Sequence, residues 1–220
     1  KVDIFWYDFT AQKPGVPWWD TFKHTADWKG KELMAMTRKL QPGIVVNDRL
    51  GGEVPADVVT PEQQKTFAWP THGGRPAPAW ETCQTFSGSW GYNRDEMTWK
   101  DLRQLLVMVI DNVSKGGNTI LNVGPTGRGN FDARARERLA GIGRWMGPNG
   151  RSVYGCGAAP KGFAAPEGTL LTYSEARRRL YVHLLEYPIG SLPITFADKV
   201  RYAQFLHDAS EVKVKVPLNV

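Results

Sequence analysis

The chain has 220 residues, of which 41% are hydrophobic, a share that supports a sizeable core and excludes wholesale disorder. Its 28 Lys and Arg residues against 22 Asp and Glu leave a formal net charge of +6. This mild excess does not by itself predict a nucleic-acid partner. No stretch approaches the roughly 18 uncharged apolar residues of a membrane span, so we expect no membrane partner.

The cysteines and histidines form no recognisable disulfide or metal motif. Cys83 and Cys156 are far apart in the chain, and the four histidines lack the spacing of metal ligands. We therefore expect two unpaired buried thiols, no metal site and no cofactor. The nine tryptophans are more unusual, because aromatic side chains stack on sugars or bases as well as filling cores.

The first two thirds of the chain alternate predicted strands with predicted helices. Strands are predicted over residues 3–9, 44–47, 80–86 and 118–123, helices over 31–40, 98–114 and 132–146, and a long loop over 11–30. A further helix start is predicted at Thr60-Pro61-Glu62, which has the pattern of a capped first turn. This alternation is typical of an α/β fold with parallel strands.

The pattern changes after Gly147, where helical spacing ends. Short alternating runs follow at residues 169–173, 180–185, 203–206 and 211–216. They predict an antiparallel sheet, in a β-sandwich or part of one. We therefore expect an α/β domain over residues 1–150 and a second domain over 151–220. The first is too short for a complete (β/α)8 barrel of about 250 residues, so it is a smaller α/β fold or the later half of a barrel.

Three acidic residues follow predicted strands, where α/β folds place functional groups. Asp8 ends the first strand, Asp48 follows the second, and Glu62 lies a little further on. Two carboxylates from different strand ends, with aromatic residues nearby, are typical of the active site of a glycosidase. Each acid also has a structural interpretation, as a turn cap or a helix-dipole partner. Glu81 is a further candidate, and equally a buried partner for Arg49.

Several motifs in a consistent order then identify a family. The segments FWYDF, VVNDR, DVVTPEQ, WETCQTFSGSWGYNRDE and VSKGGNTILNVGPTGRG resemble glycoside hydrolase family 29, the retaining α-L-fucosidases, over about residues 1–155. The resemblance implies a (β/α)8-like TIM barrel, of which only the later strand–helix units are present, followed by an antiparallel β-sandwich. It also implies hydrolysis of terminal α-L-fucosyl residues by double displacement through a covalent fucosyl-enzyme.

The resemblance assigns roles to individual residues. Asp8, in a Trp-x-Asp context, is the implied nucleophile. Glu62, in the Thr-Pro-Glu motif, is the implied acid/base, and Glu81 is the alternative, or else a substrate-binding residue. Among the substrate-binding residues, Arg49 resembles the arginine that contacts fucose. Trp6 and Trp90 resemble the aromatics that line the sugar.

The resemblance also sets expectations about partners. The substrate would be a fucosylated oligosaccharide or glycoconjugate, or an α-L-galactoside for a related glycosidase, whereas a non-catalytic fragment would only bind carbohydrate. The family's fucose-binding histidines from the first three strands have no match here. We therefore expect the chain to need an N-terminal half, from the same or another chain, and a homo-oligomer is an alternative. Relatives are commonly periplasmic, secreted or lysosomal.

Overall fold

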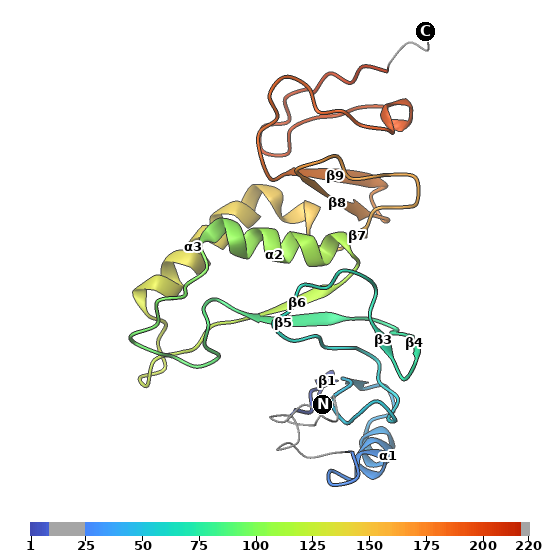
Figure 1. Cartoon of the computed structure of the whole chain (residues 1–220), viewed down its shortest axis with the longest axis vertical. Helices are drawn as coiled ribbons and strands as arrows, with labels where there is room; N and C mark the ends of the chain where they lie inside the picture. Colours follow the sequence, from blue (N-terminus) through green and yellow to red (C-terminus); the bar gives the residue numbers. More distant parts are fainter. Residues whose placement is uncertain (9–24, 217–220) are drawn as a thin grey trace. The chain divides into compact units, whose positions relative to one another are not determined.

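The computed structural model describes residues 1–8 and 25–216, so most of the loop predicted over 11–30 and the last residue of the strand predicted over 3–9 lie outside the described residues. The chain forms two compact units, Lys1–Gln84 and Thr85–Val220. Figure 1 labels most of the helices and strands of both units. The domain boundary predicted near residue 150 stays a prediction.

Parallel pairing organises the first unit. Strand β1 (Ile4–Phe5) pairs in parallel with β2 (Val45–Val46), and helix α1 (Gly30–Leu40) lies between them in the chain. Parallel bridges then join Asn47 to Val58, Val59 to Trp80 and Glu62 to Cys83, where the last two partners belong to or adjoin β5 (Glu81–Thr85). Four segments therefore lie parallel in chain order, which brings their carboxyl ends to one edge.

The helix start predicted at Thr60-Pro61-Glu62 is wrong. This segment is extended, and its backbone pairs with the neighbouring strand: Cys83 N–H donates to Pro61 C=O at 3.1 Å, and Gln63 N–H donates to Cys83 C=O at 3.0 Å. The strand neighbour thus satisfies the polar backbone groups that a helix would have satisfied internally. Pairing with the neighbouring strand therefore outweighs the local capping pattern, and no helix begins here. A small hairpin, β3 (Thr71–His72) with β4 (Arg75–Pro76), precedes β5.

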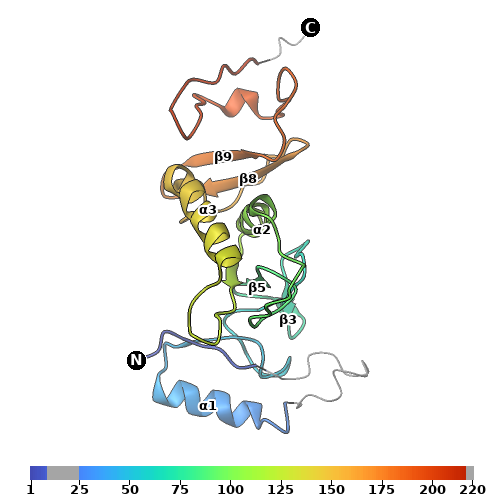
Figure 2. The same cartoon turned by 90° about the vertical axis from the view of Figure 1, so that its left-hand side faces the viewer.

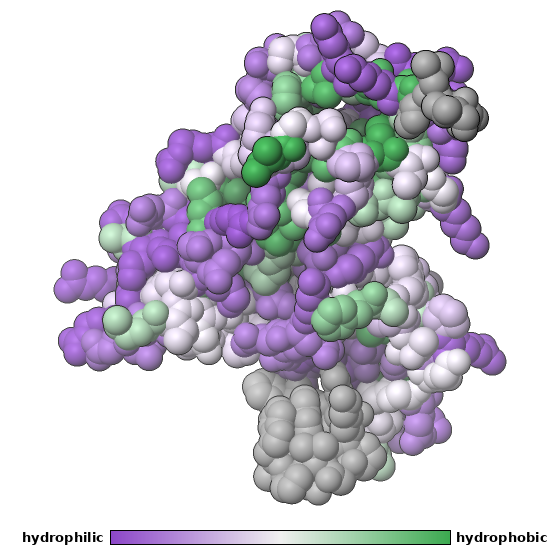
Figure 3. All heavy atoms as spheres, turned by 45° about the horizontal axis from the view of Figure 1, so that its top comes forward, coloured by the Kyte–Doolittle hydropathy of each residue, from purple (hydrophilic) through white to green (hydrophobic). Residues whose placement is uncertain are grey.

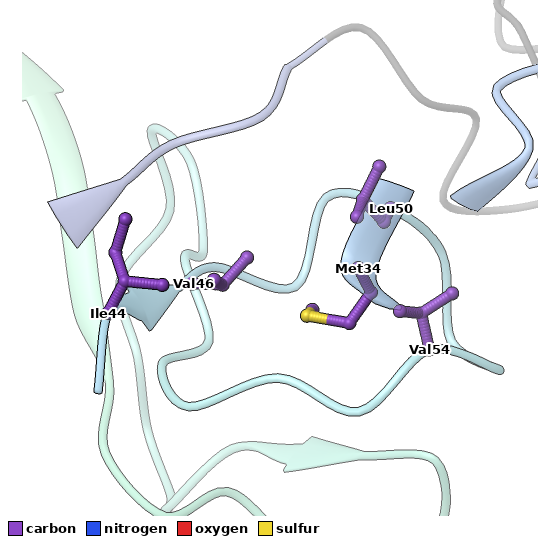
Figure 4. Close-up of a cluster of buried hydrophobic side chains, with 5 residues drawn as sticks. All are labelled: Met34, Ile44, Val46, Leu50 and Val54. Atoms are coloured by element: carbon purple, nitrogen blue, oxygen red, sulfur yellow. The ribbon is translucent and has the colours of Figure 1, made fainter. Parts of the chain in front are cut away.

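A compact apolar cluster supports the parallel strands of the first unit (Figure 4). It comprises Met34, Ile44, Val46, Leu50 and Val54, each less than a tenth exposed. The predicted helix over residues 31–40 is confirmed, and its apolar face supplies Met34 to the cluster. Burial of each such side chain contributes about 1.5–3 kcal/mol relative to exposure. The cluster thereby holds α1 against the segment that carries residues 44–54.

The second unit combines two helices with an antiparallel sheet (Figure 2). Its elements are α2 (Leu102–Ser114), β6 (Asn118–Asn122), α3 (Ala133–Asn149), the short helix η2 (Gly150–Ser152), β7 (Gly157–Ala158), β8 (Thr169–Ser174), β9 (Arg179–Leu184) and the short helix η3 (Ala197–Lys199). The sheet order is β7-β8-β9, and α2 packs against β7 and β8. A capping box at Asp101 begins α2, because its side chain accepts from the N–H of Gln104 and the Gln104 side chain accepts from Asp101 N–H.

Most of the predicted elements of this unit are present. The helices predicted over 98–114 and 132–146 and the strands over 118–123, 169–173 and 180–185 match α2, α3, β6, β8 and β9. The runs at 203–206 and 211–216 form a single antiparallel bridge, Gln204 to Glu211, rather than full strands. Turn-rich connections on either side leave too little continuous pairing for a ladder there.

The surface is mixed in hydropathy. Figure 3 shows hydrophilic residues over much of the visible face, with smaller hydrophobic groups between them. Among residues 1–8 and 25–216, every helix is too short or too polar to cross a bilayer.

A partly buried histidine links the sheet to the end of the helical region. The Thr172 hydroxyl donates to Ser152 C=O at 2.6 Å, so it accepts from Nε2 of His183, which lies 2.9 Å away. Burial lowers the pKa of His183 from the usual 6.5 to about 4. The neutral ring, protonated at Nε2, is therefore the form that the fold stabilises.

This histidine should make the unit sensitive to acid. The unfolded chain binds a proton at His183 near pH 6.5 and the folded chain only near pH 4, so stability falls as the pH drops through this window. The loss amounts to about 3 kcal/mol at most. We expect thermal unfolding of a His183→Gln variant to depend less on pH between 6.5 and 4 than that of the unsubstituted protein. His207→Gln, at an exposed ring, is the control. An equally steep dependence in His183→Gln would contradict the assignment.

Candidate active site

The carboxyl ends of the parallel strands gather the predicted acids around one arginine. Nη1 of Arg49 donates to Asp8 Oδ1 at 2.8 Å and to Glu62 Oε2 at 2.6 Å. Asp8 follows β1, Arg49 follows β2, and Glu62 lies in the extended segment that pairs with β5. The Arg49 side chain is only 6% exposed, whereas the carboxylates are 46% and 38% exposed. The two acids therefore face solvent above a buried cation.

Further contacts immobilise the guanidinium of Arg49. Its Nε donates to the Thr60 hydroxyl at 3.1 Å, and its Nη2 donates to Thr60 C=O at 3.1 Å and to Cys83 Sγ at 3.4 Å. Its carbon centre lies 4.5 Å from the centroid of the Trp6 ring. Burial opposes the charge, but the hydrogen bond and the charge of Glu62, with the bond to Asp8, outweigh it and raise the pKa of Arg49. The cation is thus permanent and fixed in direction.

The shared nitrogen limits the separation of the acids. Because 2.8 Å and 2.6 Å add to 5.4 Å, the two oxygens that bond Nη1 are at most 5.4 Å apart. Retaining glycosidases hold their two carboxyl groups about 5–5.5 Å apart, and inverting ones about 6.5–9.5 Å apart. The arrangement therefore favours direct attack by one carboxylate over activation of an intervening water.

Asp48 has a structural role in this arrangement. Its Oδ1 accepts from Thr60 N–H at 3.0 Å and from the Thr60 hydroxyl at 2.6 Å. These bonds tie the end of β2 to the segment that carries Glu62. Thr60 can then present its hydroxyl and carbonyl oxygens to Arg49 as acceptors. Asp48 thus positions the site through Thr60.

Glu81 lies on β5, where it is partly buried, and burial raises the pKa of its carboxyl. The ion pairs of Arg49 within the described part of the chain are with Asp8 and Glu62, so the alternative of Glu81 as the partner of Arg49 is wrong. The reason is register: Glu62 pairs with Cys83, which places Glu81 two residues before the level of the site. Its role as acid/base or substrate-binding residue stays a prediction.

The two cysteines are unpaired, but only Cys83 is buried as the sequence predicts. Cys83 is buried beside Arg49, and Cys156 is partly buried in the second unit. Burial raises the pKa of the Cys83 thiol to about 11, although the charge of Arg49 acts in the opposite direction. Cys83 therefore serves the site as a neutral acceptor for Arg49 rather than as a nucleophile.

Of the two predicted tryptophans, only Trp6 contacts Arg49. Trp6 is partly buried under the guanidinium of Arg49 and belongs to the site. Trp90 lies in the second unit and is 39% exposed, and its role in lining the sugar stays a prediction. Residues 1–8 and 25–216 contain no cluster of three or more His, Cys, Asp or Glu side chains that could hold a metal.

Sequence reasoning missed three polar residues of the site: Thr60, Cys83 and Asn47. Thr60 and Cys83 are acceptors for Arg49, and the Asn47 side chain bonds the backbone of Tyr7. Their closeness in sequence to the predicted acids could have identified two of them, because Asn47 adjoins Asp48 and Thr60 lies two residues before Glu62. Strand register, which no single segment reveals, decides their contacts.

Comparisons with known proteins point to one family. The family model of α-L-fucosidase matches residues 1–151. Tissue α-L-fucosidase of Bos taurus is 29% identical over 207 residues, which cover 86% of this chain and 38% of that protein. The structure of α-L-fucosidase isoenzyme 1 from Paenibacillus thiaminolyticus superposes with a TM-score of 0.81 at 32% identity, over 99% of this chain and 51% of that one.

A second solved relative binds the sugar itself. The Thermotoga maritima α-fucosidase in complex with fucose superposes with a TM-score of 0.61 at 31% identity, over 86% of this chain and 39% of that one. The chain thus spans about half or less of the length of these relatives. The family model matches more than half of the chain, so the chain belongs to the α-L-fucosidase family, glycoside hydrolase family 29.

Proposed function

We propose that the chain carries the catalytic carboxylates of a retaining α-L-fucosidase, with Asp8 as nucleophile and Glu62 as acid/base. The observation that carries the proposal is the shared bond to Nη1 of Arg49, which keeps their bonded oxygens within 5.4 Å, the sum of 2.8 Å and 2.6 Å. Family membership and the fucose complex of the Thermotoga maritima relative support fucose as the sugar.

In the first step, an oxygen of Asp8 attacks the anomeric carbon of the fucosyl residue. The bond from this carbon to the leaving oxygen breaks, and Glu62 gives its proton to that oxygen. In the second step, Glu62 takes a proton from water, whose oxygen displaces Asp8 and releases fucose. Oε2 of Glu62 faces Arg49, whereas Oε1 accepts no hydrogen bond from the described residues and can carry the proton.

Arg49 would serve both steps through its fixed charge. It stabilises the ionised form of Asp8 before attack, and it stabilises the carboxylate of Glu62 after the proton has left. We propose that Arg49 also contacts the sugar, and that Trp6 and Trp90 form apolar walls beside it. An apolar wall suits the methyl group of fucose, which a galactoside replaces with a hydroxymethyl group.

We further propose that the parallel segments belong to a (β/α)8-like barrel and that the antiparallel sheet belongs to a β-sandwich. The domains would then span residues 1–150 and 151–220. The parallel order of four successive segments and the functional groups at their carboxyl ends support the barrel. The β7-β8-β9 sheet supports the second domain.

Substitution of the nucleophile should abolish turnover. In the intact protein, Asp8→Ala is expected to lower kcat on an aryl α-L-fucoside by about a thousandfold or more, because no covalent intermediate can form. Asp3→Ala, which removes an exposed carboxylate ahead of β1, should retain full activity. An aryl α-L-galactoside, assayed in parallel, separates the two sugars. Full activity of Asp8→Ala on either sugar would contradict the assignment.

Leaving-group dependence distinguishes the two candidates for the acid. Glu62→Gln should impair fucosides with poor leaving groups by about a hundredfold or more and those with activated aryl leaving groups far less, since the latter need no proton. Glu81→Gln should affect both substrate types equally. The opposite pattern would assign the acid/base role to Glu81.

The shape of the arginine should matter as much as its charge. Arg49→Lys keeps the charge but places all its donors on one nitrogen, so it cannot reproduce the positions of Nε, Nη1 and Nη2 toward Thr60 and the two acids. We therefore expect kcat/KM to fall by about a hundredfold. Arg38→Lys is the matched control, because Arg38 pairs with Asp57 away from the two acids. Steady-state kinetics of both variants test this, and equal losses would contradict it.

A further inference from the structure

The side chain of Asn47 binds the backbone just before the proposed nucleophile. Its Oδ1 accepts from Tyr7 N–H at 2.9 Å, and its Nδ2 donates to Tyr7 C=O at 2.9 Å. Asn47 is only 1% exposed, so both bonds are shielded from water. An amide that both donates to and accepts from one residue reproduces the pattern of a strand neighbour.

This pairing begins where the backbone pairing of β1 with β2 ends. The register joins Ile4 to Val45 and Phe5 to Val46, and the next backbone bridge of this segment joins Asn47 to Val58 instead. The amide side chain of Asn47 thus continues the attachment of the first strand after its backbone has turned to the other neighbour. Without it, Tyr7 N–H and C=O would lose the partners described for them.

The bonded carbonyl belongs to the peptide that joins Tyr7 to Asp8. Fixing the orientation of this peptide restricts the backbone from which the Asp8 side chain projects. The Tyr7 hydroxyl is held separately, 2.8 Å from the hydroxyl of Thr37 on α1. Tyr7 is therefore attached at its backbone by Asn47 and at its ring by Thr37.

We propose that Asn47 is a positioning residue that orients the nucleophile Asp8 through the Tyr7–Asp8 peptide. Asn47 sets the backbone of the nucleophile, and Arg49, two residues later, holds its carboxylate. The inference rests on the proposed function, because it concerns the reactivity of Asp8. It adds a role for Asn47 that involves neither contact with the sugar nor transfer of a proton.

The first test compares two ways of releasing Tyr7. Asn47→Leu keeps the approximate shape but removes both bonds to the backbone, whereas Tyr7→Phe removes only the bond to Thr37. In the intact enzyme we expect Asn47→Leu to lower kcat on an aryl α-L-fucoside by about 10- to 100-fold, the effect of a small misplacement of a reacting group. KM should change by less than about threefold, and Tyr7→Phe should keep kcat within about threefold. Equal effects on kcat would overturn the proposal.

The second test asks whether Asn47 acts through Asp8. In an Asp8→Gly background, azide can attack the anomeric carbon in place of the carboxylate, releasing the aryl alcohol and forming the fucosyl azide. Asn47→Leu should then change the azide-supported rate by less than about twofold, because the group that it orients is gone. If Asn47→Leu lowers the azide-supported rate of Asp8→Gly as much as it lowers kcat of the unsubstituted enzyme, the proposal is overturned and Asn47 has a general structural role.

The outcomes separate this inference from the proposed function. Full activity of Asp8→Gly without azide would refute the nucleophile assignment, and the role of Asn47 with it. An inactive Asp8→Gly together with a fully active Asn47→Leu would refute only the role of Asn47. If Asn47→Leu does not fold, Asn47→Asp removes the donor to Tyr7 C=O with little change in shape. It is expected to lower kcat by about fivefold or more, and an unchanged kcat would overturn the proposal.

Discussion

The site depends on the buried guanidinium of Arg49. A cation with so little exposure needs compensating partners, and it finds them in two carboxylates, two oxygens of Thr60 and the sulfur of Cys83. These partners come from three of the parallel segments: the residue that follows the β1 region, the segment that carries Glu62, and β5. The requirement to satisfy one buried charge therefore draws the ends of the strands together and holds the two acids at the separation on which the proposed chemistry depends.

Three consecutive residues after β2 connect it to the two neighbouring segments. Asn47 reaches back to the first strand through Tyr7, Asp48 reaches forward to Thr60, and Arg49 joins both neighbours by charge. The central segment of a parallel arrangement has a neighbour on each side, which makes it the natural place for such links. The proposed nucleophile and acid thus lie on the two segments that flank β2, and residues 47–49 position them.

The second unit is built on another principle. Its antiparallel sheet packs against α2, and the neutral ring of His183 bonds Thr172 within the sheet. Here burial favours an uncharged histidine, whereas in the first unit strong partners preserve a buried cation. The difference lies in the partners: a hydroxyl cannot compensate a charge, and a pair of carboxylates can.

Local pattern alone determined α1, α2 and α3, because apolar spacing and capping residues act within a few turns of chain. It also determined the short parallel strands, the change to an antiparallel sheet, and the motifs that resemble the fucosidase family. It failed at Thr60-Pro61-Glu62, where a capping pattern lost to pairing with Cys83. Only tertiary structure decided that Arg49 pairs with Glu62 rather than Glu81, and that Asn47 holds Tyr7. These contacts join residues 13 and 40 positions apart, and they depend on parallel register, which no local segment encodes.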